Sequence, residues 1–152
     1  MDILKSMGED PEKWLSDDGL EGYRKGLVLV DPDLVLRVLS FQGWLGEELI
    51  LNDRGLGLSN RGFRSWREHE SLYRGREAPR FSQHLFGMAQ DMHVAGRSGP
   101  WLSAKALEWS KERAEACGGL VEVGFTGVGE YETFVHVDVR RPTRNRIARW
   151  KG

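Results

Sequence analysis

The amino-acid sequence predicts an α+β fold, in which helices pack on one face of a small, mostly antiparallel sheet and the other face carries a site. A helix is expected from about 100 to 117. Ser98-Gly99-Pro100 is typical of a helix start, and the glycines at 118 and 119 are typical of a helix end. Two strands are expected after it, over 120–125 and 132–140, and the glycines between them favour a turn. Helices on one side of such a sheet are the architecture of the α+β class.

Length and composition restrict the class of protein. With 152 residues the chain fits one domain, 1–152, and its 39% hydrophobic and 30% charged residues are those of an ordinary globular protein. The 22 Lys+Arg nearly balance the 23 Asp+Glu, so the net charge of -1 does not favour a general polyanion binder. A single cysteine, Cys117, excludes an internal disulfide and a zinc site built mainly from thiolates. No apolar run has the length of a signal-peptide core or a membrane span, so we expect a cytoplasmic protein, or one released by lysis or export.

The N-terminal residues 1–30 are expected to be largely irregular. A short helix is expected at 11–15, but three glycines between 19 and 26 interrupt any periodic pattern beyond it. Asp31-Pro32 then predicts the N-cap and first turn of a helix over 32–41, which ends at Gly43 or Gly46.

The middle of the chain is expected to consist of short elements joined by glycine-rich connections. The apolar run 48–52 predicts a buried strand, and the glycines from 55 to 62 predict a loop. One or two helical turns are expected over 66–73. A further strand is expected over 87–94, in which Asp91 and His93 share one face because side chains alternate along a strand.

The strand over 132–140 alternates between apolar and polar side chains. Val135, Val137 and Val139 point to one face, which is suited to burial. The opposite face, left free for chemistry, carries Phe134, His136, Asp138 and Arg140. The alternative is an amphipathic edge strand whose polar side is merely solvated, and this is the commoner explanation of an isolated His-x-Asp.

The C-terminal residues 141–152 contain several arginines and a tryptophan, and the default expectation is a solvated basic tail. The sharper alternative is a tail that contacts an anionic wall polymer, a membrane surface or nucleic acid. The glycine-rich segment from 118 to 129 lacks the Gly-Lys-Ser/Thr of a phosphate-binding loop, which argues against a nucleotide cofactor.

Two histidines and an aspartate suggest a metal site. The segment from Ser82 to Asp91 contains His84 as well as Asp91, and the last expected strand adds His136. Two imidazoles and one carboxylate are the ligand set of a catalytic zinc ion that keeps one coordination position open for water. The alternative is that these two histidines and the aspartate occur in this order by chance and bind no metal. His69 has carboxylate neighbours in the sequence, and we expect it to be solvated.

The order and spacing of these residues resemble a known family. Ser82-x-His84 with Gly87, Ala89 and Asp91, followed by Phe134-x-His136-x-Asp138, resembles the M15 family of zinc D-alanyl-D-alanine carboxypeptidases and related peptidoglycan peptidases, which shares its domain with the hedgehog signalling fold. Gly62-Phe63-Arg64-Ser65 looks like the family's Ser-Gly-Tyr-Arg-Ser stretch. The resemblance covers the chain from about Leu49 to Arg140 and implies the hedgehog-type zinc peptidase fold.

The resemblance also implies roles for five residues. His84, Asp91 and His136 would bind Zn²⁺, with water in the fourth position. Arg64 and Ser82 fall where the family holds its substrate, and a guanidinium suits a peptide carboxylate because it can donate two parallel hydrogen bonds. The alternative for Arg64 is an ordinary surface ion pair.

The catalytic base departs from the family pattern. Many relatives carry an acidic residue three positions before the second histidine ligand, where this chain has Thr133. Asp138 could accept a proton through the zinc-bound water or, in the interpretation we favour, only orient an imidazole. Glu132 would reach the water only if the strand bends. His93 could stabilise an oxyanion or receive a proton, and its alternative is a polar surface histidine.

From the resemblance we expect a zinc-dependent peptidase that cleaves peptidoglycan stem peptides, as a D-alanine carboxypeptidase or as an L,D- or D,D-endopeptidase. The small size and the lack of a signal peptide are similar to phage endolysins. The alternative, which the missing upstream acid motivates, is a non-catalytic, zinc-containing binding protein or virion component of the same fold.

Overall fold

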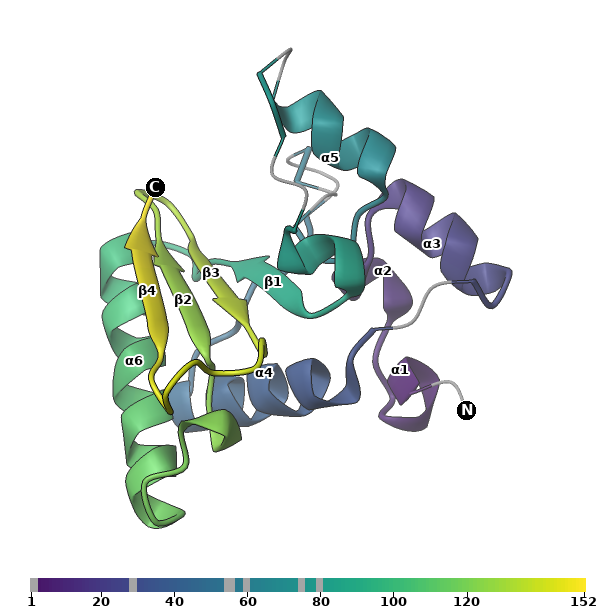
Figure 1. Ribbon diagram of the computed structural model, residues 1–152. Helices are drawn as coiled ribbons and strands as arrows, with labels where there is room; N and C mark the ends of the chain where they lie inside the picture. Colours follow the sequence, from purple (N-terminus) through teal and green to yellow (C-terminus); the bar gives the residue numbers. More distant parts are fainter. Residues whose placement is uncertain (1–2, 28–29, 54–56, 59–60, 74–75, 79–80) are drawn as a thin grey trace.

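The computed structural model describes residues 3–27, 30–53, 57–58, 61–73, 76–78 and 81–152, and these form an α+β architecture (Figure 1). Four short strands make one mixed sheet in the order β1-β3-β2-β4. They are β1 Ala89–Met92, β2 Gly127–Glu130, β3 Val135–Asp138 and β4 Ala148–Lys151. β3 runs antiparallel to both β1 and β2, whereas β4 is parallel to β2. The expected α+β class is confirmed, with a sheet that is mixed.

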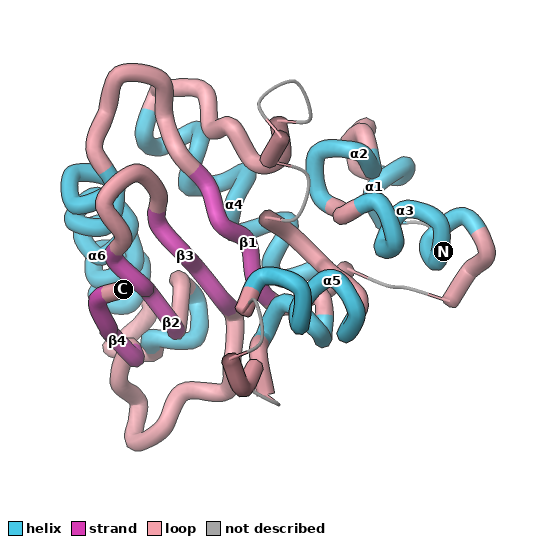
Figure 2. Tube along the Cα trace, turned by 90° about the horizontal axis from the view of Figure 1, so that it is seen from above, coloured by secondary structure: helices cyan, strands magenta, loops and turns pink. Residues whose placement is uncertain are grey.

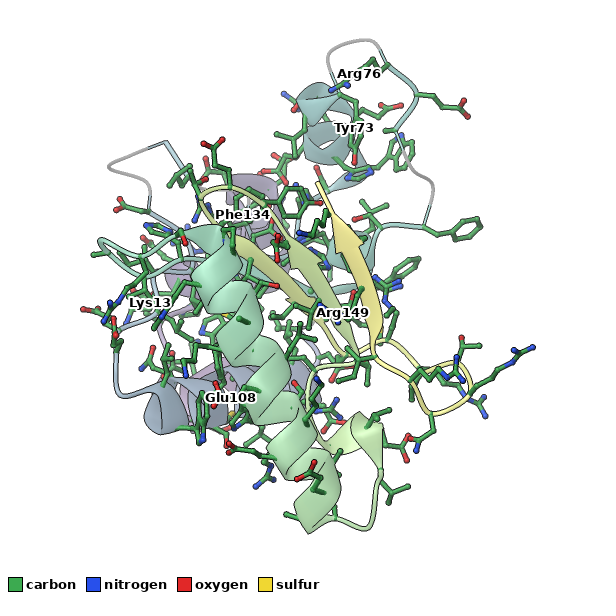
Figure 3. All side chains as sticks on the ribbon, turned by 90° about the vertical axis from the view of Figure 1, so that its left-hand side faces the viewer. Lys13, Tyr73, Arg76, Glu108, Phe134 and Arg149 are labelled. Atoms are coloured by element: carbon green, nitrogen blue, oxygen red, sulfur yellow. The ribbon has the colours of Figure 1, made fainter. Side chains whose placement is uncertain are left out.

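One face of the sheet is apolar and packs against helix α6, Gly99–Ala116, which lies along the strands (Figures 1 and 2). Val128, Val135 and Val137 are at most 1% exposed on this face. The expected helix over 100–117 is therefore confirmed to within one residue at each end. Figure 3 views the molecule from the side of α6, with the sheet behind it.

Helix α4, Pro32–Leu45, packs beside α6 at the bottom of the sheet in Figure 1. Phe41 lies 5.6 Å from Trp109 and 5.5 Å from Phe125 between ring centroids, so an aromatic cluster joins the two helices. Asp31 caps α4 as expected by accepting from the backbone N–H of Asp33. The helix runs past 41 to Leu45 and ends at Gly46, one of the two glycines expected to close it, whose φ of 71° suits glycine.

Strand β2 occupies glycines that the sequence suggested as a turn. The prediction of a strand over 120–125 is wrong, because Val121–Val123 forms a short 3₁₀ helix, η3. Strand β2 begins only at Gly127. A Cβ at Gly127 would lie 2.3 Å from Asp138 Oδ1, and one at Gly129 would lie 2.5 Å from the Trp150 indole. The glycines in β2 are therefore required by the close approach of other side chains.

The other expected strands are shorter in the structure. The strand expected over 48–52 is reduced to a bridge between Ile50 and His93. The segment 87–94 contributes only β1, and 132–140 contributes only β3. The alternation expected for β3 is confirmed, since its valines face α6 and His136 and Asp138 share the opposite face.

The N-terminal segment is helical, which corrects the expectation of irregular chain over most of 1–30. The described residues form α1 Ile3–Ser6, α2 Pro11–Trp14 and α3 Asp17–Arg24. Ser16 caps α3 by accepting from the N–H of Gly19 at 3.0 Å. Gly19 does not break the helix; it permits close packing, because a Cβ there would lie 2.8 Å from the Phe63 ring.

Helix α5, Trp66–Leu72, begins with a capping box formed by Ser65 and Glu68. Glu68 also accepts from the Ser16 hydroxyl at 2.5 Å and from the N–H of Asp18 at 3.1 Å, which ties α5 to the start of α3. His69 is only 1% exposed, between the rings of Trp66 and Tyr73. The expectation that His69 is solvated was therefore wrong.

The C-terminal residues form a turn and a strand instead of the expected basic tail. Asn145 holds the turn: its side chain donates to Gly119 O at 2.7 Å and accepts from Val121 N at 3.1 Å. Strand β4 then pairs with β2, and Ile147 packs against the core. Arg141, Arg144 and Arg146 are exposed on this turn. Within the described residues, no helix has the length and apolarity needed to cross a membrane.

Deletion of residues 143–152 should destabilise the protein because it removes β4 and the packing of Ile147. We expect the free energy of unfolding to fall by about 2 kcal/mol, and Tm by about 5 °C or more. Replacing Arg141, Arg144 and Arg146 together by glutamine should change Tm by less than about 2 °C, since these side chains are exposed. Thermal unfolding followed by circular dichroism measures both variants. Equal Tm values for the two would contradict the assignment of β4.

Candidate metal centre

The three expected metal ligands come from three different elements. His84 lies in the 3₁₀ helix η2, Gln83–Phe86, Asp91 in β1 and His136 in β3. Asp91 and His136 are direct partners in the β1–β3 ladder, so strand pairing places them side by side. Gly87, with a φ of 67°, ends η2 in the left-handed conformation and leads the chain toward β1. The residues from His84 to Asp91 thus form the end of η2, a glycine turn and the first part of β1.

The ligand atoms of these residues converge. His84 Nε2 lies 3.1 Å from Asp91 Oδ1 and 3.0 Å from His136 Nδ1, and His136 Nδ1 lies 2.9 Å from the same Asp91 oxygen. All three residues are buried. No second group of histidine, cysteine or acidic side chains suited to a metal ion occurs in the part of the chain that the structure describes.

The outer nitrogens of both histidines face hydrogen-bond acceptors. His84 Nδ1 lies 2.8 Å from the carbonyl oxygen of Gly62, and His136 Nε2 lies 3.1 Å from Asp138 Oδ2. Carbonyl and carboxylate oxygens only accept, so these nitrogens carry the proton of each neutral imidazole. The inner nitrogens then direct lone pairs toward each other and toward Asp91 Oδ1. Three acceptors that meet at one point are satisfied by a cation.

A zinc ion fits this set of donors. Ligand atoms about 2.0–2.1 Å from a tetrahedral zinc are about 3.3–3.4 Å apart. The three atoms here are 2.9–3.1 Å apart, so small outward shifts would seat the ion. Imidazole and carboxylate ligands both suit zinc. Structural zinc sites have four protein ligands, whereas the described residues provide three, which is the number found in catalytic sites.

Burial and mutual contact shift the pKa values of the ligands. Burial lowers the pKa of His84 to about 4, against the opposing influence of Asp91. Burial alone would raise the pKa of Asp91, but the charges and hydrogen bonds of the two histidines hold it well below its usual range. Burial would likewise lower the pKa of His136, but hydrogen bonds to Asp138 and Asp91 raise it. Metal binding requires an ionised Asp91 and neutral imidazoles, so the shifts of Asp91 and His84 favour it and the raised pKa of His136 opposes it.

Asp138 and Arg140 support His136 from the side away from the other ligands. Asp138 is fully buried, and its two carboxylate oxygens accept from Arg140 Nε at 2.8 and 2.9 Å. Burial would raise the pKa of Asp138, but hydrogen bonds from His136 and Arg140 lower it to about 2. Because Asp138 contacts the outer nitrogen of His136, its position favours the orienting role over that of a base.

The segment that orients His84 lies between the N-terminal helices and β1. The backbone of Phe63 is hydrogen-bonded to the chain at the end of α2. Its N–H donates to Trp14 O at 3.3 Å, and its carbonyl oxygen accepts from Ser16 N at 2.9 Å. On the other side, Arg61 O accepts from Asp91 N at 2.7 Å. Gly62 is required between them, since a Cβ there would lie 1.8 Å from Trp14 O. The carbonyl that fixes the tautomer of His84 is therefore positioned by tertiary contacts.

A pocket of about 370 Å³ adjoins the three ligands. Both expected substrate-binding residues, Arg64 and Ser82, line it. The side chain of Arg64 is only 10% exposed, so Arg64 does not form the surface ion pair that was the alternative. Its Nη2 lies 3.7 Å from Asp91 Oδ2. Its Nε is buried and has no hydrogen-bond partner among the described residues. The described residues that line the pocket are Arg64, Tyr73, Phe81, Ser82, Gln83, His84, Asp91, Tyr131, Phe134, His136, Arg140 and Trp150.

None of the three expected catalytic candidates is among the described residues that line this pocket: Asp138 lies behind His136, and His93 and Glu132 lie elsewhere. His93 Nδ1 lies 2.5 Å from Arg61 Nη1, and the backbone of His93 pairs with Ile50. Glu132 is exposed in the turn before β3, so the strand does not bend to bring it to the ligands. Asp91 is the sole carboxylate among the described residues that line the pocket.

The pocket also contains residues that the sequence reasoning did not assign to the site. Tyr131 follows β2, and Trp150 lies in β4, within the segment expected to be a basic tail. Arg140 was placed on the correct face by strand alternation but was given no role. The sequence feature that could have indicated a role for Trp150 is the glycine at 129, because its missing side chain leaves room for the indole.

Comparison of the chain with protein-family models, with curated proteins and with solved structures found no match. The resemblance to the M15 family therefore rests on the sequence motifs, and the hedgehog-type fold is an expectation based on them. The convergence of His84, Asp91 and His136 is a separate observation, since it follows from distances between atoms.

Substitution of a ligand should abolish zinc binding. We expect the wild-type chain to bind one equivalent of zinc, and His84→Ala and Asp91→Asn to bind none tightly, because two ligands are insufficient. His93→Gln is the matched control and should retain the full equivalent. Zinc content is measured by elemental analysis after dialysis. Tight zinc binding by His84→Ala would show that the motif is accidental.

Asp138→Asn should weaken zinc binding without abolishing it. The variant keeps the side-chain volume but loses the charge that fixes His136 and pairs with Arg140, so we expect zinc affinity to fall about 10- to 100-fold. Competition with a chromogenic chelator measures the Kd. Asp33→Asn, at an exposed position in α4, is the control. An unchanged Kd in Asp138→Asn would exclude the orienting role.

Proposed function

We propose that this chain is a zinc-dependent peptidase that cleaves peptidoglycan stem peptides. The observation that carries the proposal is the convergence of His84, Asp91 and His136 beside a pocket of about 370 Å³. Three protein ligands leave one position of a tetrahedral ion for solvent. When bound, zinc would lower the pKa of a water molecule to about 7 and polarise the scissile carbonyl.

The protein's own residues would orient the ligands and the substrate. Gly62 O and Asp138 hold the two imidazoles in the tautomers that face the ion. Arg64 presents a buried Nε without a partner among the described residues, which suits a carboxylate of the peptide. The hydroxyl of Ser82 makes no capping hydrogen bond at the start of η2, and Ser82 lines the pocket, where this hydroxyl would bind a peptide group.

The choice of peptidoglycan as the substrate rests on the resemblance to M15 peptidases, supported by the position of Arg64 in the pocket. A D-alanine carboxypeptidase would hold the terminal carboxylate of the stem on Arg64, and an L,D- or D,D-endopeptidase would hold an internal carboxylate there. Action on this substrate requires release of the protein by lysis or export, as with a phage endolysin.

The second candidate function is a non-catalytic, zinc-containing binding protein or virion component. One observation favours it: of the described residues that line the pocket, Asp91 alone carries a carboxylate, and it is committed to the metal. Hydrolysis requires a group that accepts the proton of the attacking water. Without such a group the pocket would hold stem peptides and leave them intact.

Mass spectrometry of muropeptides after incubation with the zinc-loaded chain tests the proposal. We expect products whose masses identify the cleaved bond, and no product after chelation of zinc or in His136→Ala, because the ion and its ligand are then missing. Re-addition of zinc should restore cleavage in the wild type alone. Intact muropeptides, with a full equivalent of zinc bound, would exclude the peptidase in favour of the binding protein.

Glu132→Gln and His93→Gln refine the same experiment. Since neither residue lines the pocket, we expect each variant to retain the wild-type rate within about threefold. A large loss of rate in one of them, with normal zinc content, would identify that residue as the missing proton acceptor.

A further inference from the structure

A row of aligned residues crosses the whole sheet at the level of the metal ligands. Asp91 in β1 pairs with His136 in β3, His136 pairs with Gly129 in β2, and Gly129 pairs with Trp150 in β4. Directly paired residues project from the same face of a sheet. Trp150 therefore lies on the face of the ligands, separated from His136 only by a residue without a side chain.

The gap at Gly129 brings Trp150 against His136. A Cβ at Gly129 would lie 2.5 Å from both Cε2 and Nε1 of the indole, so the ring occupies the space above this glycine. The ring centroids of Trp150 and His136 are 5.1 Å apart. The last strand thus places a large aromatic ring beside a metal ligand.

Two further rings extend this surface. Trp150 Nε1 donates to the Tyr131 hydroxyl at 3.4 Å, and Tyr131 stacks on Phe134 with centroids 4.4 Å apart and ring planes at 9°. All three residues line the pocket. We refer to Trp150, Tyr131 and Phe134 as the aromatic wall.

The aromatic wall suits an uncharged group. The Arg140 guanidinium lies 4.9 Å from the Trp150 ring centroid, but its charge is paired with Asp138, so it does not make the wall an anion site. A cationic group would be repelled by Arg64 and by a bound zinc ion. Aromatic faces bind aliphatic C–H groups by burying apolar surface.

We infer that Trp150 is a specificity-determining residue, and that the aromatic wall binds the uncharged aliphatic side chain of the substrate residue next to the cleaved bond. This inference rests on the proposed peptidase function. The contact of the indole with His136 places the bound group beside the reacting carbonyl, so it belongs to the peptide near that bond and not to a distant sugar.

Two synthetic stem peptides test the inference, identical except for D-alanine or D-glutamate at the residue next to the cleaved bond. The wild type should prefer the alanyl peptide. Trp150→Ala should raise KM for that peptide about 10-fold with kcat within about twofold, and should change KM for the glutamyl peptide less. Trp150→Phe, which keeps a ring, should stay within about threefold of the wild type.

Gly129→Ala gives a second variant that leaves Trp150 in the chain. The added methyl group would displace the indole, so KM for the alanyl peptide should rise as in Trp150→Ala. Trp101→Ala is the matched control, because Trp101, in α6, contacts Arg97 and is not among the described residues that line the pocket. Zinc content and Tm are measured for every variant, so that loss of fold or metal is recognised.

Calorimetric titration of both peptides into each variant separates this inference from the proposed function. If the wild type binds without cleaving, and Trp150→Ala weakens binding of the alanyl peptide alone about 10-fold, the inference stands without the peptidase. Equal KM and Kd for wild type and Trp150→Ala, in a chain that cleaves, overturn the inference alone. A wild type that neither binds nor cleaves overturns both.

Discussion

The direct pairing of Asp91 with His136 across β1 and β3 is the constraint on which the site depends. It places a carboxylate oxygen 2.9 Å from an imidazole nitrogen, and η2 brings His84 Nε2 to within 3.1 Å of both. The hydrogen-bond partners behind the two rings turn their lone pairs inward. Buried acceptors without donors are costly. A cation at this point would remove that cost, so burial of these groups would favour metal binding.

One face of the sheet contributes to the stability of the fold, and the other carries the candidate site. Valines from β2 and β3 pack on α6, and this face forms the core. On the other face, glycines at 127 and 129 leave room for Asp138 and Trp150, the side chains that flank His136. A larger residue at either position would displace one of them. The small residues of β2 therefore serve the site, although none of them supplies a ligand atom.

Support for His84 comes from the opposite end of the chain. The N-terminal helices hold the segment 61–63 through backbone hydrogen bonds to Trp14 and Ser16, and this segment supplies the carbonyl that fixes the tautomer of His84. Glu68 ties α5 to the same region through Ser16. Disruption of this helical region is thus expected to affect the metal site, because the orientation of an imidazole depends on the partner of its second nitrogen.

The sequence by itself determined the local features of this protein. The caps of α4 and α6, the alternation in β3 and the residue types of a candidate metal site were all visible, because short-range spacing and side-chain chemistry encode them. Tertiary structure decided the strand identity of β2 and β4, the helical N-terminus, the burial of His69 and the place of Trp150 in the pocket. These features depend on contacts between distant segments, where a glycine that locally indicates a turn is instead required by a side chain from another strand.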